Sequence, residues 1–288
     1  MRLLSTRRRH PATRALFLAM ALFVMGVLYA TVAPASTSTA DGSRSTQVEE
    51  GKALYQVGCS SCHGMNGEGT SQGPTLIGVG SASVDFQMET GRMPAAAPGA
   101  QMPIKPNRYT SEEIAAIAAY VDSLGTGVQI PNTSQYSLEK PTRAQFGQGQ
   151  TGDAEYQQAM DEYYRTVARG GELFRTNCSA CHNFQGSGGA LPKGKHAPSL
   201  EGVSGKHIWE AMRTGPQQMP VFSEETITDE DAAAIIAYLD HMHSDNPNGG
   251  FTLGSLGPVS EGLWAWVLGI GGAVVFAIWI TAKGVRAK

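Results

Sequence analysis

The chain has 288 residues, which is enough for two domains of ordinary size. Its 35 glycines and 15 prolines indicate loop-rich domains rather than long helical bundles. All 25 acidic residues lie between Asp41 and Glu261 together with only 14 of the 22 lysines and arginines, so this central stretch has a formal charge of −11. An acidic centre argues against nucleic acid as a partner, because phosphate binding requires clustered basic side chains. The four cysteines form two close pairs, which leaves none for a disulfide framework.

The N-terminal segment, residues 1–35, combines five arginines with an apolar run at residues 15–33. This pattern is typical of a secretory signal, with Ala33-Pro34-Ala35 as a small-residue cleavage site. The 19 residues of the run are also long enough for a retained membrane anchor helix. Both interpretations stay open, and in both the basic flank holds the N-terminus in the cytoplasm and sends the following residues outside.

The middle of the chain contains the same unit twice. Gly51 recurs as Gly170 at an offset of 119 residues, and Tyr120 recurs as Tyr238 at an offset of 118. Each unit of about 80 residues is short for a domain and workable if a large apolar cofactor supplies part of the core. We therefore predict domain 1, a linker, domain 2 and a second linker at residues 46–127, 128–160, 161–243 and 244–262.

Within each unit the pattern predicts a helix, a cysteine motif, an irregular loop and a closing helix. Thr110 with Glu113, and Thr228 with Asp231, have the spacing of a capping box at the start of the two closing helices. No alternating strand pattern of useful length occurs. The predicted fold class is mainly α, with two tandem domains.

The C-terminal run at residues 263–282 has 20 residues without a charge, and three basic residues lie in the tail at 283–288. A buried core helix is the alternative, but the length, the terminal position and the one-sided basic flank favour a transmembrane helix. The sequence thus predicts a cell-membrane protein with its two domains on the extracytoplasmic side and its C-terminus in the cytoplasm.

Two Cys-x-x-Cys-His motifs carry the chemistry, as Cys59, Cys62 and His63 in unit one and as Cys178, Cys181 and His182 in unit two. In such a motif both thiols lie on one helical turn, where they can form thioethers to one porphyrin, and the histidine faces its iron. A single copy could also be a thioredoxin-like redox pair or half of a zinc site. Two copies on an exported segment predict two covalently bound haems c, with His63 and His182 as axial iron ligands.

A methionine sulfur is the usual second axial ligand in an electron carrier. In unit two we predict Met219, which follows Thr214-Gly215 and precedes a proline. In unit one the register from the preceding loop favours Met93, whereas the distance to the closing helix favours Met102. We predict Met93 and keep Met102 as the alternative.

A proline recurs after each motif, as Pro74 and Pro198. The carbonyls of these prolines are candidates to accept a hydrogen bond from the second ring nitrogen of the haem histidines. We interpret the remaining histidines of unit two as surface residues, because none has a counterpart in unit one. They are His196, His207, His241 and His243.

Each unit resembles a class I cytochrome c domain in its opening helix, haem motif, Pro-x-Leu segment, Met-Pro segment and closing helix. The whole chain is similar to the dihaem cytochrome c subunit of actinobacterial quinol–cytochrome c reductase. Residues 90–94, Thr-Gly-Arg-Met-Pro, resemble that family's first-domain ligand segment. The insertion at residues 95–105 has no equivalent in unit two.

The resemblance implies a subunit of the respiratory menaquinol–cytochrome c reductase. Such a chain carries electrons from the Rieske iron–sulfur subunit, beside a cytochrome b subunit, to the haem–copper cytochrome c oxidase. It belongs to an enzyme complex but has no substrate-transforming site of its own.

Two other functions fit the motifs. A membrane-anchored dihaem subunit of a periplasmic dehydrogenase would use the same haems with a different donor. A dihaem peroxidase would require one iron with an open site and nearby acid–base groups, and the methionine candidates in both units argue against it.

Overall fold

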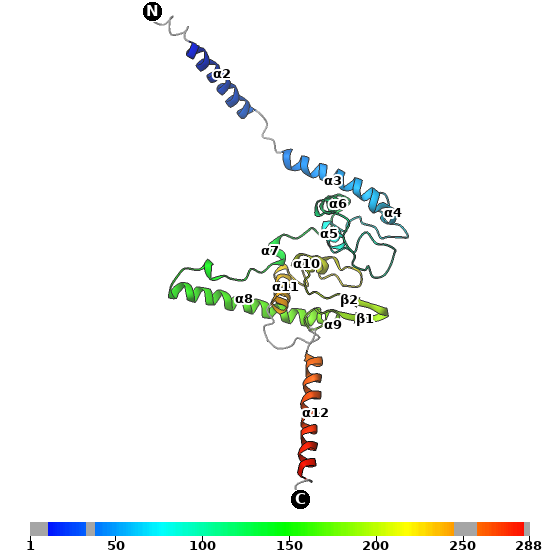
Figure 1. The fold of residues 1–288 in the computed structure, drawn as a ribbon. Coiled ribbons are helices and arrows are strands. Elements are labelled where there is room, and N and C mark those ends of the chain that lie inside the picture. The colour runs from blue at the N-terminus through cyan, green and yellow to red at the C-terminus, as the bar shows by residue number, and fades with distance from the viewer. Residues whose placement is uncertain (1–10, 33–37, 245–257, 285–288) are drawn as a thin grey trace, which may run out of the picture. The chain divides into compact units, whose positions relative to one another are not determined.

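The structure is a computed structural model that describes residues 11–32, 38–244 and 258–284 (Figure 1). The chain divides into two compact units, residues 1–46 and 47–288. The first unit contains helix α2 (Pro11–Val32) and the first part of α3 (Ser38–Gly58). The predicted cleavage site at residues 33–35 lies outside the described residues.

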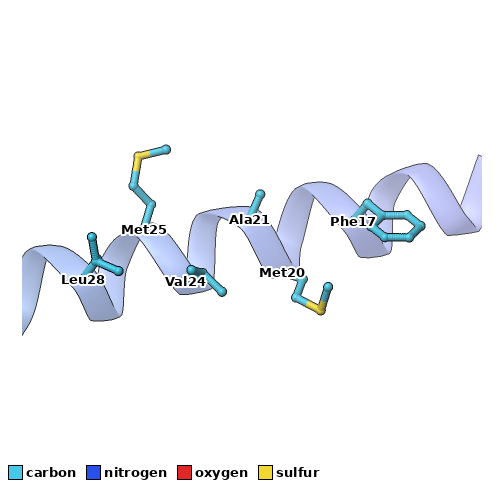
Figure 2. Close-up of a pocket in the computed structure, with 6 residues that line it drawn as sticks. All are labelled: Phe17, Met20, Ala21, Val24, Met25 and Leu28. Carbon is cyan, nitrogen blue, oxygen red and sulfur yellow. The ribbon is translucent and has the colours of Figure 1, made fainter.

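Helix α2 exposes apolar side chains along its described part, residues 15–28. Figure 2 shows six apolar side chains of this helix, namely Phe17, Met20, Ala21, Val24, Met25 and Leu28. A helix that is apolar on all sides is suited to a lipid environment. This agrees with both interpretations of the N-terminal run.

Domain 1 forms around the contact between its first and last helices. Its elements are α3, α4 (Ser60–His63), α5 (Ser81–Glu89) and α6 (Ser111–Ser123). The core consists of eight buried side chains from α3, α5 and α6: Tyr55, Val84, Met88, Ile114, Ile117, Ala118, Tyr120 and Val121. The helical spacing in α6 thus places its apolar face on α5 and on the end of α3.

Domain 2 repeats this plan with a longer first helix. Its elements are α8 (Gln150–Asn177), α9 (Ser179–His182), β1 (Gly189–Leu191), β2 (Lys195–Ala197), α10 (Gly205–Thr214) and α11 (Asp229–Ser244). The strands pair antiparallel, with Ala190 opposite His196, and a 3₁₀ turn at Pro192–Gly194 joins them. The chain is therefore mainly helical as predicted, with a hairpin too short for an alternating pattern to reveal.

The closing helices start where the sequence predicts. Thr110 accepts a hydrogen bond from the backbone N–H of Glu113, and the Glu113 side chain accepts one from the Thr110 N–H, which completes a capping box. At α11 the Thr228 hydroxyl accepts from the Asp231 N–H at 3.1 Å. The Asp231 carboxylate pairs with Arg169 of α8 instead of turning back to the cap.

The segment at residues 128–160, predicted as a linker, contains regular structure. Helix α7 (Thr133–Tyr136) packs against α10 and α11, a 3₁₀ turn lies at Arg143–Gln145, and α8 already begins at Gln150. Gly149, at φ +90°, precedes that helix start. The linker is thus partly docked on domain 2.

Helix α12 (Pro258–Gly284) contains the predicted C-terminal span. Among the described residues, Val259–Lys283 is the single segment long and apolar enough to cross a membrane, and Ala15–Leu28 is a shorter apolar helix. The side chains described in α12 are almost all exposed, as expected of a helix that meets lipid.

Candidate functional site

The two cysteine motifs form one tight helical turn in each domain. The backbone N–H groups of Cys62 and His63 both donate to the Cys59 carbonyl, at 3.1 and 3.0 Å. Domain 2 repeats this with Cys178 as the shared acceptor, at 3.1 Å from the Cys181 nitrogen and 2.9 Å from the nitrogen of the following histidine. Because the chain turns helically here, the two thiols and the histidine of each motif are held close together.

The first cysteine of each motif lies against a hydrophobic core. Cys59 packs on the core of domain 1, and Cys178 packs on that of domain 2. Burial raises the pKa of each of these thiols to about 11, and the second cysteine of the motif adds to the shift. None of the four cysteines forms a disulfide, so each motif offers two sulfurs for thioether bonds at an apolar surface.

The motif histidines are oriented by backbone carbonyls. His63 Nδ1 lies 2.8 Å from the Pro74 oxygen, and His182 Nδ1 lies 3.0 Å from the Pro198 oxygen. A proton on Nδ1 donates to the carbonyl and leaves Nε2 as the nitrogen with a free lone pair. Burial lowers the pKa of His182, which favours the neutral, ligating form. The predicted histidine–proline hydrogen bonds are confirmed.

A glycine lets the backbone of the following loop approach each motif closely. A Cβ at Gly73 would lie 2.8 Å from the Cys62 oxygen and 3.2 Å from His63 Cε1. A Cβ at Gly189 would lie 2.6 Å from the Cys181 oxygen. Two thiols, one oriented imidazole and a backbone that approaches them this closely fit the requirements of a covalently held haem in each domain.

The methionine candidates differ in what they contact. Met93 packs against the core of domain 1, and Met219 packs against the core of domain 2. The backbone N–H of Met102 instead donates to Gln217 Oε1 of domain 2 at 3.2 Å. These contacts favour Met93 over Met102, and the ligand assignment remains a prediction.

Comparison with known proteins agrees with this geometry. A family model described as cytochrome c matches residues 48–125, and one described as cytochrome c oxidase, cbb3-type, subunit III matches residues 165–239. The cytochrome bc1 complex cytochrome c subunit of Corynebacterium diphtheriae is 41% identical over 277 residues, which cover 96% of this chain and 95% of the relative. The protein of the same name from Mycobacterium leprae is 40% identical over 271 residues, which cover 93% of this chain and 87% of the relative.

This chain belongs to the family of cytochrome bc1 complex cytochrome c subunits. The predicted family is confirmed, and so is the fold class of two tandem cytochrome c domains with an N-terminal helix and an apolar C-terminal helix. The two domains indicate two covalently bound haems c.

One contact between the two domains of this cytochrome c subunit was not expected from the sequence. The insertion at residues 95–105 reaches domain 2, where Gln101 Nε2 donates to the His196 carbonyl at 2.7 Å and Gln101 Oε1 accepts from the His196 N–H at 3.2 Å. The signal available in the sequence was the insertion itself, since unit two has no counterpart to it.

The interpretation of His207 as a surface residue is wrong. Its side chain is 18% exposed and lies 3.8 Å from the carboxylate of Asp85 in the other domain. His207 stands on α10, and this helix packs against α5 of domain 1. Sequence reasoning missed this because a contact between two domains leaves no periodic signal within either of them.

Proposed function

We propose that this chain is the electron-transferring subunit of a membrane-bound respiratory quinol–cytochrome c reductase. The observation that carries the proposal is the pair of complete haem-binding motifs in a chain that matches cytochrome bc1 complex cytochrome c subunits over nearly its whole length. Menaquinol is the expected electron source. The chain itself makes and breaks no substrate bonds.

Each domain contributes the same protein groups. Cys59 and Cys62, or Cys178 and Cys181, would hold the cofactor covalently. His63 and His182 would ligate iron through Nε2, and Met93 and Met219 would supply thioether ligands. Haem c supplies a one-electron carrier when it is bound, because its iron alternates between two oxidation states.

The protein's own contribution is to keep these ligands still. The proline carbonyls fix the imidazole rings, and the packed first cysteines tie each motif to its core. Ligands that move little between oxidation states lower the reorganisation that electron transfer requires. Fixed ligands in two adjoining domains are suited to relaying electrons and not to binding a substrate.

The partners follow from the family and the membrane anchor. We infer that the chain takes electrons from the Rieske iron–sulfur subunit, next to the cytochrome b subunit, and delivers them to a haem–copper cytochrome c oxidase. Helix α12 would tether the haem domains on the extracytoplasmic face, with the basic C-terminal tail inside. The acidic centre of the chain then faces the outside.

Purification of the tagged chain from native membranes in mild detergent tests this function. A reduced-minus-oxidised spectrum with b- and a-type haem bands beside the c-type bands is expected. A spectrum with c-type bands alone and a soluble dehydrogenase in the eluate would favour the dehydrogenase subunit instead. Binding of carbon monoxide to the reduced isolated chain would indicate an open iron site and favour a peroxidase.

A further inference from the structure

The contact between α5 and α10 encloses a group of charged side chains drawn from both cytochrome c domains. Asp85 lies on α5 of domain 1, and Lys206, His207 and Glu210 lie on α10 of domain 2. The two helices occupy equivalent places in the repeated units, yet their charged residues stand at non-equivalent positions. Asp85 corresponds to Trp209, and Glu210 corresponds to Phe86. The cluster therefore belongs to the interface and not to the cytochrome c fold.

Three of these side chains converge on one point. Ligand atoms of Asp85, His207 and Glu210 all lie within 4.8 Å of one another. His207 Nε2 is 3.8 Å from Asp85 Oδ2. Ligands of a tetrahedral zinc ion stand about 2.0–2.2 Å from the metal and therefore about 3.3–3.6 Å from each other. A small contraction of side chains would bring the three groups to that distance.

The same side chains are buried without adequate partners. Glu210 is fully buried, and neither of its carboxylate oxygens has a hydrogen-bond partner. His207 Nε2 is also buried without one. Asp85 is 6% exposed. Buried polar atoms in native proteins are almost always satisfied, so Glu210 and His207 have unused bonding capacity at the point where the three side chains converge.

The imidazole ring of His207 is held in place by an aromatic contact from the other domain. Phe86 of α5 meets it edge-on, with ring centroids 6.3 Å apart. Burial is the main cause that lowers the pKa of His207, which favours the neutral imidazole that a metal requires. One imidazole with two carboxylates suits zinc, whereas calcium and magnesium prefer oxygen ligands alone.

We propose that Asp85, His207 and Glu210 bind one zinc ion that links the two cytochrome c domains. Two ligands come from α10 and one from α5, so the zinc site is complete only when the two domains are in contact. Each of these helices runs directly into the loop that carries a predicted axial methionine, Met93 or Met219. The ion would thereby hold both ligand loops to one another.

Lys206 competes with the metal at this site. Its Nζ lies 2.6 Å from Asp85 Oδ2, and its side chain is 29% exposed. Because Lys206 is partly exposed, its ammonium would move to solvent when a metal takes its place at the carboxylate. Removal of the ammonium would free Asp85 Oδ2 from its ion pair with Lys206.

Zinc binding to the full-length dihaem protein in detergent tests the proposal. After treatment with a chelator, the protein is titrated with zinc chloride against a chromogenic zinc indicator, and bound zinc is measured by elemental analysis. The two haem irons provide an internal standard. We expect one zinc for every two irons, and a loss of affinity by more than about 100-fold in Asp85→Asn, His207→Gln and Glu210→Gln, beyond the effect of outer-shell changes.

Two further variants separate metal binding from loss of structure. His196→Gln alters an exposed histidine of the same domain and should bind zinc as the parent does. Lys206→Met should bind zinc at least ~10-fold more tightly, a gain that unfolding cannot produce. Absence of stoichiometric zinc in the parent, or unchanged affinity in Glu210→Gln with an intact c-type spectrum, would overturn the proposal.

Discussion

Two Met-Pro dipeptides compete for the axial position of domain 1, and they differ in surroundings. Met93 packs on the domain core, while the backbone of Met102 is bound to domain 2. A thioether ligand raises the potential of a haem. Met93→Ala should therefore lower the midpoint potential of one of the two haems, within the roughly 0.8 V range that axial ligands control. Redox titration of the purified chain, followed in the c-type absorption bands, measures this shift.

Met102→Ala is the matched control, because it removes a thioether sulfur of the same kind from the insertion that follows Met93. Its potentials should equal those of the parent. A shift in Met102→Ala together with unchanged potentials in Met93→Ala would assign the ligand to Met102. Met219→Ala should lower the potential of the other haem.

Asp229, at the first position of α11, collects three donors from separate parts of domain 2 and its linker. Arg213 Nη2, Trp209 Nε1 and Gln135 Nε2 lie 2.6, 2.8 and 2.8 Å from its oxygens. Burial opposes ionisation of this carboxyl, but the hydrogen bonds from Arg213, Gln135 and Trp209 outweigh it and hold its pKa below the ordinary value. The ionised carboxylate is therefore the form that stabilises the fold.

Asp229→Asn should destabilise domain 2 by about 1–3 kcal/mol. The NH₂ group of the new side chain would face one of the existing N–H donors, and Arg213 would lose its counter-charge. A depressed folded-state pKa stabilises the protein above the unfolded value of about 3.9, and this contribution is lost as pH falls through the folded value. Denaturant unfolding at pH 7 and near pH 3 should show that the variant loses less stability than the parent on acidification.

Asp153→Asn provides the comparison for an exposed ion pair. Asp153 pairs with Arg143 at 2.6 Å, but the two side chains are 63% and 40% exposed. Exposed pairs contribute about 0–1 kcal/mol, so this variant should unfold like the parent at both pH values. An equal loss in both variants would contradict the role given to the Asp229 network.

Residue-level roles were predictable where the repeat constrained them. The Cys-x-x-Cys-His motif and the following proline recur, and the two histidine–carbonyl bonds formed as expected. His207 was not predictable in this way. Its burial depends on a contact between two domains, and the faces that meet carry residues that the repeat does not share.

At the scale of elements, the opening and closing helices of each domain cross at a glycine. A Cβ at Gly51 would lie 1.9 Å from the Ala116 oxygen, and one at Gly170 would lie 1.9 Å from the Ala234 oxygen. Only a residue without a side chain lets the backbones approach this closely. Gly51→Ala and Gly170→Ala should each destabilise their own domain by about 1–3 kcal/mol or more, since the helices must separate.

Thermal unfolding followed by circular dichroism measures this loss. Gly147→Ala serves as the control, because a Cβ there meets nothing within 4 Å. Its stability should stay within about 0.5 kcal/mol of the parent. Parent-like unfolding of both helix-crossing variants would mean that the crossing is wider than the structure has it.

The sequence predicted elements by local signals, and it failed where local signals are weak. Periodicity and the capping residues located α6 and α11. The hairpin was missed because three-residue strands are shorter than the alternation that identifies a strand. Helix α7 has a single turn and depends on packing against α10 and α11, which no local pattern encodes.

At the scale of the whole molecule, internal repetition and the two apolar runs predicted the number of domains and the apolar C-terminal helix. They did not predict how the domains meet. The insertion at residues 95–105 had no assigned role, and its contacts with domain 2 now provide one. The interface combines this loop with the α5–α10 contact.

Gln101 completes the exposed edge of the hairpin in domain 2. Its side-chain amide bonds both backbone groups of His196, in the manner of a third strand. In Gln101→Ala the His196 N–H and carbonyl lose their partners and become open to water. Net hydrogen bonds of this kind contribute about 0.5–1.5 kcal/mol each, so the contact between the loop and the hairpin should weaken by about 1–3 kcal/mol.

Hydrogen exchange followed by mass spectrometry on the full-length dihaem protein measures that weakening where it occurs. Peptides that contain β2 and residues 95–105 should exchange faster in Gln101→Ala, while α6 and α11 keep their protection, because each domain core is unchanged. Gln72→Ala, which alters an exposed glutamine of domain 1, should leave all of these peptides as in the parent. Unchanged exchange at β2 in Gln101→Ala would show that the loop does not hold the domains together, and the α5–α10 contact would then be the connection on which their arrangement depends.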